Sequence, residues 1–372
     1  MTGRTIVLAA NASWNIANFR AGLVRGLREA GYDPVAVTPP DAAADKRLKE
    51  LGIPAVPVRI DRSGVDPFAD LALLLRYRRV LKRLRPVAFL GFTVKPNIYG
   101  TLAASSLGIP VIANVSGLGT VFIRTGLLER VVSALYRLAF HRAAIVFFHN
   151  PEDRDLFVGR RIVAAEKARL LPGSGIDLDR FAPVELPDGP FTFLLIARLL
   201  RDKGVREYAE AARLLRTQLP GARFQLLGGL DEGNRTAISA SELQSWVDEG
   251  MVEYLGETDD VRPFIASATA LVLPSYREGL PRSLLEGAAM GRPLIATDVP
   301  GCRQVVEAGI NGFLCAVRDA RSLAEAMKKL ADLPPEERSA MGAASRRMVQ
   351  DGFSEQRVVR AYLEVLDGLR AR

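Results

Sequence analysis

The feature that most constrains the fold is an alternation of two patterns along the whole chain. Short, largely apolar runs alternate with longer segments that have the 3.6-residue apolar period of an amphipathic helix. Apolar runs of this kind are typical of strands buried on both faces, as in parallel sheets, and their alternation with helices predicts doubly wound α/β domains. We expect strands near residues 5–10, 34–38, 87–91, 111–114 and 145–148 in the first half, and near residues 191–197, 223–227, 252–255, 270–274, 294–296 and 312–315 in the second.

The alternation is interrupted at residues 182–190, where three prolines and a glycine stand close together. A chain of 372 residues, 48% of them hydrophobic, is long enough to bury two cores. We therefore expect two Rossmann-like domains, residues 1–184 and 185–354, with a hinge in the proline-rich segment. We also expect a C-terminal helix over residues 355–372 that packs back on the first domain.

Two glutamates follow the expected strand at 270–274, in the segment Pro274-Ser-Tyr-Arg-Glu-Gly-Leu-Pro-Arg-Ser-Leu-Leu-Glu286. If Leu280–Met290 is helical, Glu278 lies at the helix N-terminus, where exposed N–H groups and the helix dipole favour anions. Glu286 then lies about two turns further along. Ligands of open α/β sheets bind beyond the carboxyl ends of the strands, so this segment is a candidate ligand site. Acidic residues also occur at helix N-termini for structural reasons alone, so one glutamate does not establish a site.

Two cations, Arg198 and Lys203, follow the expected strand at 191–197, in the loop before an expected helix at 205–219. The planar guanidinium fork of arginine matches phosphate oxygens, and lysine supplies a mobile point charge. Together they suit a diphosphate. Loop cations are more often solvated surface charges, and it is the spacing of this pair from the two glutamates that indicates a site.

Several other kinds of site are absent from the sequence. The first strand is not followed by the glycine fingerprint of dinucleotide enzymes, and there is no P-loop. Cys302 and Cys315 are the two cysteines of the chain, which excludes a disulfide framework and favours a reducing cytoplasm. No apolar run reaches the ~18 residues that a membrane-spanning helix needs. We expect a cytoplasmic protein without a metal or a cofactor.

The order of these motifs resembles that of the retaining GT-B glycosyltransferases of family 4, over nearly the whole chain. The resemblance implies the GT-B fold, in which two doubly wound domains face a central cleft, with a nucleotide-sugar donor bound by the second domain. It rests on Ala197-Arg198, Lys203-Gly204, Leu226-Leu-Gly228, Glu278 with Glu286, Gly291-Arg-Pro-Leu-Ile-Ala-Thr297 and Asn311-Gly-Phe-Leu314.

The resemblance implies that Arg198 and Lys203 bind the donor diphosphate and act in catalysis. Because these cations would offset the charge that builds on the leaving diphosphate, we expect no requirement for a divalent metal. Retention of configuration is implied by the resemblance alone, since the sequence shows no obvious nucleophile.

The two glutamates receive different roles from the same resemblance. Glu278, also a catalytic candidate, would orient hydroxyls of the donor sugar, helped by the N–H groups of Gly279 and Leu280. Glu286 would accept a hydrogen bond from the ribose of the nucleotide.

Three segments of the first half resemble bacterial transferases that add N-acetylhexosamine to polyprenyl-diphosphate-linked sugars. This narrower resemblance makes Asn15, Arg20, Lys95 and Asn97 candidate acceptor-binding residues, with Arg20 and Lys95 as the phosphate contacts. The segments are Ser13–Arg20, Phe92–Gly100 and Ala113–Thr120.

One departure from the family concerns histidine. Many members carry a histidine after a strand in the middle of the first domain, whereas the comparable strand here leads into Asn114. A catalytic role for that histidine therefore cannot be transferred. The histidines of this chain, His141 and His149, flank an apolar strand, and we expect packing or capping roles for them.

Charge is unevenly divided between the two halves. Residues 1–185 hold 26 lysines and arginines against 16 aspartates and glutamates, a net charge of +10, which leaves −2 for the rest of a chain whose net charge is +8. The first domain is therefore expected to face an anionic partner. No recognisable nucleic-acid module is present and aromatic residues are few, so we expect that partner not to be a nucleic acid.

The cations are concentrated in Leu71–Arg85, a leucine-rich segment with the pattern of an amphipathic helix, and recur around Leu127–Arg142. Two explanations of the first segment remain open. The helix can lie on the anionic inner leaflet of a membrane, or its leucines can simply pack on the sheet. The cations proposed for the membrane contact are Arg78, Arg79, Lys82 and Arg83.

These features predict a metal-independent, retaining glycosyltransferase of glycan or polysaccharide biosynthesis. It would move a sugar, an N-acetylhexosamine by the narrower resemblance, from a UDP-sugar to a lipid-linked, anionic saccharide acceptor. A GT-B epimerase that acts on a sugar nucleotide, and a non-catalytic sugar-nucleotide sensor, are the alternatives that the sequence leaves open.

Overall fold

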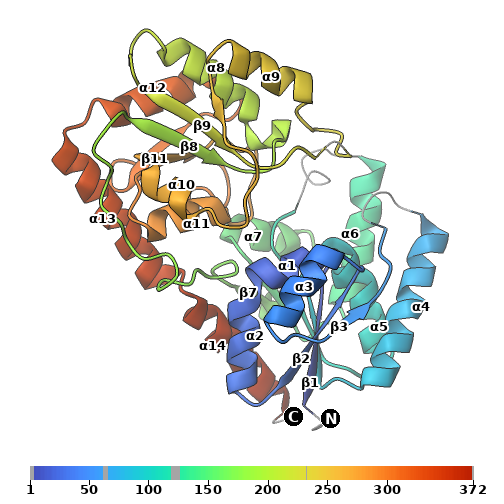
Figure 1. Ribbon diagram of the computed structural model, residues 1–372. Helices are drawn as coiled ribbons and strands as arrows, with labels where there is room; N and C mark the ends of the chain where they lie inside the picture. Colours follow the sequence, from blue (N-terminus) through green and yellow to red (C-terminus); the bar gives the residue numbers. More distant parts are fainter. Residues whose placement is uncertain (1–3, 62–65, 119–125, 232, 371–372) are drawn as a thin grey trace. The chain divides into compact units, whose positions relative to one another are not determined.

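The computed structural model describes residues 4–61, 66–118, 126–231 and 233–370 (Figure 1). These residues form two compact units. The first unit takes in the described residues up to Gly175 and those from Glu355 onward, and the second spans Ile176–Ser354. Each unit contains one parallel sheet with helices on both faces, so the predicted pair of doubly wound α/β domains is confirmed.

The first unit is built on a seven-stranded sheet in the order β3-β2-β1-β4-β5-β6-β7, and every neighbouring pair is parallel. A chain that leaves the carboxyl edge of a parallel sheet must return to the amino edge before the next strand begins, and helices make most of these returns. The strands are β1 (Thr5–Ala9), β2 (Asp33–Thr38), β3 (Ala55–Pro57), β4 (Ala88–Gly91), β5 (Val111–Val115), β6 (Ile145–Phe148) and β7 (Ala168–Leu170).

Helices cover both faces of this sheet. On one face lie α1 (Ser13–Phe19), α2 (Ala21–Glu29), α3 (Ala42–Glu50) and α14 (Glu355–Arg370). On the other lie α4 (Pro67–Leu84), the short π-helix η1 (Pro96–Gly100), α5 (Thr101–Ser105), α6 (Leu127–Phe140) and α7 (Pro151–Gly159).

The last helix, α14, belongs to the first unit although it follows the second in the sequence. Val358, Tyr362, Val365 and Leu366, which share one face of the helix, are buried in the core of the first unit. Helix α2 offers glycine opposite α14, and a Cβ on Gly26 would lie 2.3 Å from the side chain of Val359. The absence of a side chain at this position lets the two helices approach closely.

The second unit is built on a six-stranded sheet in the order β10-β9-β8-β11-β12-β13, again parallel throughout. Its strands are β8 (Thr192–Ile196), β9 (Arg223–Leu227), β10 (Glu253–Tyr254), β11 (Ala270–Leu273), β12 (Leu294–Thr297) and β13 (Gly312–Cys315). Its helices are η4 (Arg201–Lys203, a single 3₁₀ turn), α8 (Val205–Leu215), α9 (Ala240–Asp248), α10 (Arg262–Ser267), α11 (Arg282–Ala289), α12 (Ala320–Ala331) and α13 (Pro335–Gly352).

The chain passes into the second unit at residue 176, before the boundary that the proline-rich segment suggested. Two arginines hold the intervening residues to the second unit. Arg346 donates to the carbonyls of Leu178 and Phe181, and the buried Arg292 donates to those of Val184 and Glu185. The proline-rich composition predicts a break in secondary structure. It does not predict the hydrogen bonds that attach the segment to the second unit.

Helix α11 begins at Arg282, two residues later than the expected start at Leu280. Pro281 is its N-cap, and the residue before a proline is disfavoured in the helical conformation. Glu278 therefore lies in the turn that precedes α11 and not at its N-terminus, and Glu286 lies about one turn into the helix. Among the described residues, no helix is both long and apolar enough to cross a membrane.

Candidate functional site

The candidate site lies at the carboxyl edge of the second sheet, where β8 and β11 end. These strands are hydrogen-bonded neighbours in parallel register, so the loops that follow them are held side by side. After β8 come Arg198 and the turn η4, and after β11 comes the acidic turn, residues 274–281. This edge is where open α/β sheets bind their ligands.

An ion pair joins the two loops. The ammonium of Lys203 lies 2.5 Å from Oε1 of Glu278, and both side chains are largely withdrawn from solvent, with exposed fractions of 24% and 13%. The hydroxyl of Ser275 donates to the same carboxylate oxygen at 2.7 Å. A second link is the backbone N–H of Tyr276, which donates to the carbonyl of Asp202 at 3.0 Å. The position of Glu278 is therefore fixed from both loops.

Two glycines of neighbouring segments make close backbone contacts with the acidic turn. Gly204, which follows η4 with φ 73°, lies so near the end of β11 that a Cβ would stand 2.1 Å from the carbonyl oxygen of Pro274. Gly301, after β12 with φ 82°, lies so near the turn that a Cβ would stand 2.6 Å from the carbonyl oxygen of Gly279. Both positions need glycine for the conformation and for the contact.

The second glutamate has its own cation. Nε of Arg282 donates to Oε1 of Glu286 at 2.8 Å, and the exposed fractions of the two side chains are 17% and 12%. Burial raises the pKa of Glu286 above its ordinary value, and the guanidinium of Arg282 acts in the opposite direction. The pair spans one helical turn, i to i+4.

Arg198 lies apart from these two pairs. Its guanidinium is 62% exposed and bonds to the carboxylate of Asp231 at 2.7 Å, in the loop that follows β9. Each ionised candidate of this edge thus has a partner of opposite charge: Asp231 for Arg198, Glu278 for Lys203 and Arg282 for Glu286.

Comparison with known protein families identifies the family of the chain. Residues 16–173 match the glycosyl transferase 4-like domain, and residues 190–332 match the glycosyl transferases group 1 family. The chain is a GT-B glycosyltransferase of family 4.

Relatives and solved structures agree with this assignment. The chain is 29% identical, over 96% of its length and 97% of the relative's, to the N,N'-diacetylbacillosaminyl-diphospho-undecaprenol α-1,3-N-acetylgalactosaminyltransferase of Campylobacter jejuni. It is 24% identical, over 72% of both chains, to an Escherichia coli enzyme named UDP-Gal:α-D-GlcNAc-diphosphoundecaprenol α-1,3-galactosyltransferase. The structure of HepE from Anabaena with UDP and glucose shares the fold, with a TM-score of 0.81 at 16% identity, over 98% of this chain and 100% of that one. Epimerase and sensor functions are thereby set aside in favour of glycosyl transfer.

The other candidate residues of the second unit, Gly279 and Leu280, lie in the acidic turn directly after Glu278. Gly279 is buried, and Leu280 is half-buried and packs against the core on that face of the sheet. Sequence reasoning missed three residues that position the candidates, namely Ser275, Asp231 and Arg282. The i to i+4 spacing of Arg282 and Glu286 was a usable signal, whereas nothing in the sequence pairs Asp231 with Arg198.

The acceptor candidates of the first unit lie near the carboxyl edge of its sheet. Asn15 is half-buried in α1. Lys95 precedes η1 and its ammonium bonds to the carboxylate of Asp70 at 2.8 Å, while the hydroxyl of Tyr99 donates to the other oxygen of that carboxylate. Two residues of the third resembling segment, 119 and 120, lie outside the described residues.

Two of the acceptor candidates, Arg20 and Asn97, are buried. Arg20 is 3% exposed and its guanidinium stacks on the ring of Phe92, 4.4 Å from the centroid. The side-chain amide of Asn97 donates to the carbonyl of Asn114 at 2.8 Å. Asn114, the residue that stands where the family often has histidine, donates in turn to the hydroxyl of Tyr362 on α14.

His149, which follows β6, is buried as well. Burial, together with the charge of Arg20, lowers the pKa of His149 to about 3, so its imidazole is neutral at ordinary pH. A packing role, which the sequence suggested, agrees with this position.

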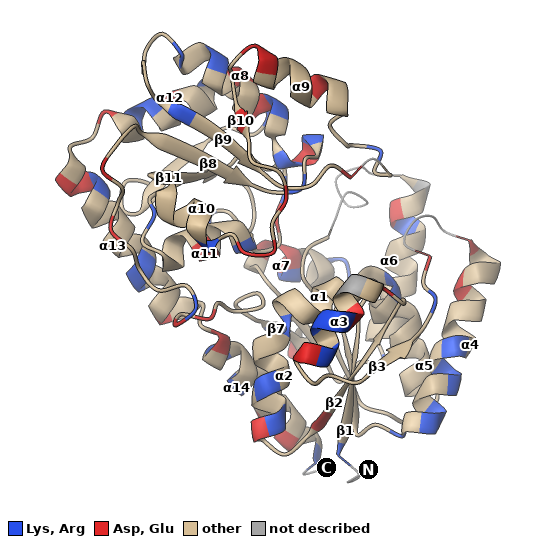
Figure 2. Cartoon of the chain, in the orientation of Figure 1, with Lys and Arg blue, Asp and Glu red and all other residues tan. Residues whose placement is uncertain are grey.

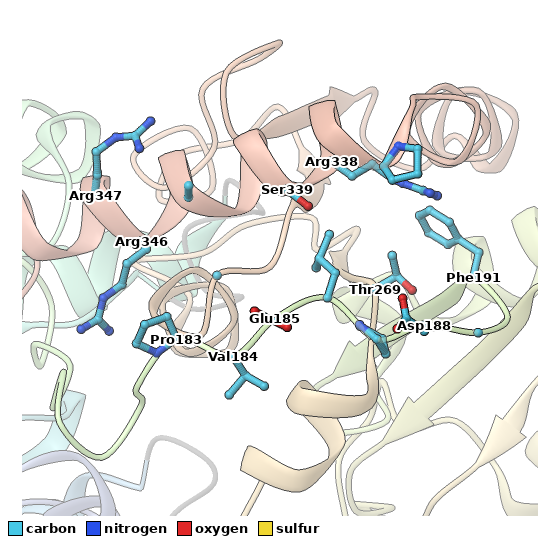
Figure 3. Close-up of a pocket in the computed structure, with 16 residues that line it drawn as sticks. Pro183, Val184, Glu185, Asp188, Phe191, Thr269, Arg338, Ser339, Arg346 and Arg347 are labelled. Carbon is cyan, nitrogen blue, oxygen red and sulfur yellow. The ribbon is translucent and has the colours of Figure 1, made fainter.

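A cavity of about 950 Å³ in the second unit lies at the wrong edge of the sheet to be this site (Figure 3). Phe191 and Thr269, which line it, directly precede β8 and β11, so it opens at the amino edge. Its walls are residues 183–189 and helix α13, and the guanidinium of Arg338 lies 5.3 Å from the ring of Phe191 (Figure 3). The Lys203–Glu278 pair is at the opposite edge.

The close approach of Gly301 to the acidic turn generates a stability prediction. Gly301→Ala should lower the free energy of unfolding by about 1–3 kcal/mol, because the methyl group meets the carbonyls of Glu278 and Gly279. Gly309→Ala is a matched control, since Gly309 has nearly the same φ of 81° but no atom within 4 Å of a Cβ, so it carries the backbone strain without the contact. Urea denaturation measures both. Equal losses in the two variants would mean that the contact with the turn contributes nothing.

Proposed function

We propose that this chain transfers an N-acetylhexosamine, with retention of configuration, from a UDP-sugar to a saccharide carried on a lipid diphosphate. The reaction would serve glycan or polysaccharide biosynthesis at the cytoplasmic face of a membrane. The observation that carries the proposal is the Lys203–Glu278 pair at the joined carboxyl ends of β8 and β11. The near full-length similarity to the C. jejuni N-acetylgalactosaminyltransferase supports the choice of sugar and acceptor.

The donor site is proposed to open by exchange of ion-pair partners. The diphosphate of the donor takes Lys203 and Arg198, so these cations leave Glu278 and Asp231. The carboxylate of Glu278 is then available to accept hydrogen bonds from hydroxyls of the donor sugar, beside the N–H groups of Gly279 and Leu280. The charges of Lys203 and Arg198 are compensated by the two carboxylates before binding and by the diphosphate after it.

Glu286 is proposed to accept from the ribose of the nucleotide. Its carboxylate keeps a second oxygen for this purpose, because the guanidinium of Arg282 donates to Oε1. Arg282 also favours the ionised form of Glu286, which is the stronger acceptor for hydroxyls of the ligand.

Two cations on the leaving diphosphate supply the stabilisation that a divalent metal gives in other transferases. When the glycosidic bond to the donor breaks, negative charge grows on the diphosphate, and preformed cations lower the energy of that state. Metal independence is proposed on this ground, and retention on the family resemblance.

The acceptor is proposed to bind at the carboxyl edge of the first sheet. Lys95 and Asn15 lie at this edge and are partly exposed, so they can contact the acceptor diphosphate and its sugar. Arg20 and Asn97 are buried in the structure and would shape that edge from beneath. The cations of α4 are proposed to make a peripheral contact with the anionic membrane leaflet that carries the acceptor.

The proposal is tested by incubating the purified protein with a panel of UDP-sugars, with and without a short polyprenyl-diphosphate-linked saccharide. We expect an N-acetylhexosamine to appear on the acceptor with the anomeric configuration of the donor, and turnover to persist in excess EDTA. Release of an epimerised UDP-sugar without acceptor, or donor binding with no reaction, would contradict transfer. Loss of activity in EDTA that magnesium or manganese restores would contradict metal independence.

The cation pair generates a second prediction. Lys203→Ala and Arg198→Ala should each lower kcat by on the order of 10²-fold, the usual effect of removing one charge contact to a transition state. Arg206→Ala is the matched control. This substitution also removes one positive charge, from the neighbouring helix α8, but Arg206 pairs with Glu242 and is not a candidate for the diphosphate. Near-normal turnover of both site variants would remove the diphosphate assignment.

The raised pKa of Glu286 gives a third prediction, on pH dependence. The ionised carboxylate accepts from the ribose more strongly than the protonated acid, so the affinity for a UDP-sugar should fall as the pH is lowered through the raised pKa of Glu286. Glu286→Gln should bind the donor more weakly by about 1–2 kcal/mol at neutral pH and should lose this acid dependence. Calorimetric titration with UDP and with the UDP-sugar measures both. If only the sugar-bearing ligand weakens, the roles of Glu278 and Glu286 are reversed.

A further inference from the structure

Helix α4 has apolar side chains on its exposed face as well as on the face that packs on the sheet. Leu73, Tyr77 and Leu81 pack into the core of the first unit. Phe68, Leu71 and Leu75 do not, and the side chain of Phe68 is 85% exposed. The leucines of this helix are thus divided between two faces, and packing on the sheet explains only one of them.

The exposed face of α4 changes character along its length. Phe68, Leu71 and Leu75 occupy the first two turns, and Arg79 and Lys82 continue the same stripe at spacings of three and four residues. Figure 2 shows the cations gathered in the second half of the helix. Residues 71–85 contain six cations and no acidic residue.

A second helix of the same layer repeats the apolar part of this surface. In α6, Leu128, Val131 and Leu138 share one face and are 40–50% exposed, and Leu135 between them is partly buried. The opposite flank of α6 packs on the core, and its Glu129 bonds to Arg160, the residue that follows α7. Both α4 and α6 pack against η1, so they border the same part of the first unit (Figure 1).

We infer that α4 and α6 form an insertion surface that buries these apolar side chains in the hydrocarbon boundary of an anionic bilayer, while the cations of α4 contact the lipid headgroups. The inference rests on the proposed function, in that the acceptor is carried by a lipid. The apolar stretch from Phe68 to Leu75 is about 10 Å long, measured along the helix axis. Interfacial helices bury an apolar face in the boundary between headgroups and acyl chains.

The positive charge of α4 favours an anionic bilayer over a second copy of the chain as the partner of this surface. A symmetric contact through α4 would bring its five cations together with the same five cations of the second copy, with no carboxylate of residues 71–85 to offset them. A bilayer with anionic headgroups presents opposite charge and apolar material together. A surface of this composition matches both halves of the stripe.

The orientation of the two helices links the insertion surface to the acceptor. Because β3, β4, β5 and β6 are parallel, α4 and α6 both run from the carboxyl edge of the sheet to its amino edge. The apolar end of α4 and Leu128 of α6 therefore lie near the edge that holds Lys95 and Asn15. Insertion of this end would bring the acceptor loops to the headgroup level, where the diphosphate of a lipid-linked saccharide lies.

Vesicle binding with matched variants of the full chain tests the inference. One variant is Phe68→Ser with Leu71→Ser and Leu75→Ser, a second is Leu128→Ser with Leu138→Ser, and a third is Arg79→Glu with Lys82→Glu. The control is Leu214→Ser with Ile310→Ser and Val317→Ser, which removes apolar side chains of 36–51% exposure from the second unit. Flotation is measured with phosphatidylcholine alone and with added phosphatidylglycerol, at about 0.1 M and about 1 M salt.

We expect the α4 serine variant to bind mixed vesicles at least tenfold more weakly at both salt concentrations, and the α6 variant at least threefold more weakly. The charge variant should lose at least tenfold at low salt and little more at high salt, because screening acts mainly on exposed charges. The control should stay within twofold of the wild type, and transfer to a short, soluble acceptor should be unchanged in all variants.

Three outcomes would overturn the inference. One is binding of the α4 serine variant within twofold of the wild type. Another is complete loss of wild-type binding at high salt, which would leave only surface charge. The third is a dimer in sedimentation that the α4 serine variant dissolves, which would make the surface an interface between copies. Failure of the wild type to transfer sugar to the soluble acceptor would instead contradict the proposed function and leave vesicle binding as a separate result.

Discussion

The parallel pairing of β8 with β11 is the constraint on which the site of this glycosyltransferase depends. It places the loop of Lys203 beside the loop of Glu278, although 75 positions separate the two residues in the sequence. The ion pair then fixes the two loops to each other, and Gly204 and Gly301 allow the backbone of neighbouring segments to close around them. A cation and a carboxylate are thereby held at the sheet edge where nucleotide ligands of this fold class bind.

Much of the fold could be predicted because buried parallel strands leave a strong mark on the sequence. The eleven expected strands are all present. The two strands that were missed, β3 and β7, are three-residue strands at the edges of the first sheet and contain exposed residues, so they lack the apolar run that marks a central strand. The predicted start of α11 at Leu280 was wrong. Leucine is common in helices, but Pro281 follows it, and a residue before proline is disfavoured in the helical conformation.

The sequence indicated where the candidate residues lie, at the ends of neighbouring strands, but it indicated less about how they pair. Strand ends followed by polar residues located Arg198, Lys203, Glu278 and Glu286, since loops after parallel strands converge at one edge. The spacing of Arg282 and Glu286 on one helix was a usable signal for their pairing. The partner of Arg198, Asp231, follows a different strand, and it was found only in the structure. The burial of Arg20 and Asn97 was equally invisible, because polar residues near strand ends serve the fold as well as ligands.

The Lys203–Glu278 pair is the resting state of the proposed donor site, and a crystal structure of the chain with UDP tests that claim most directly. We predict UDP at the carboxyl edge of the second sheet, with diphosphate oxygens within hydrogen-bonding distance of Lys203 and Arg198. The ribose should contact Glu286, and Nζ of Lys203 should be withdrawn from Glu278. UDP bound elsewhere, for example in the cavity between α13 and residues 183–189, with the Lys203–Glu278 pair intact, would contradict it.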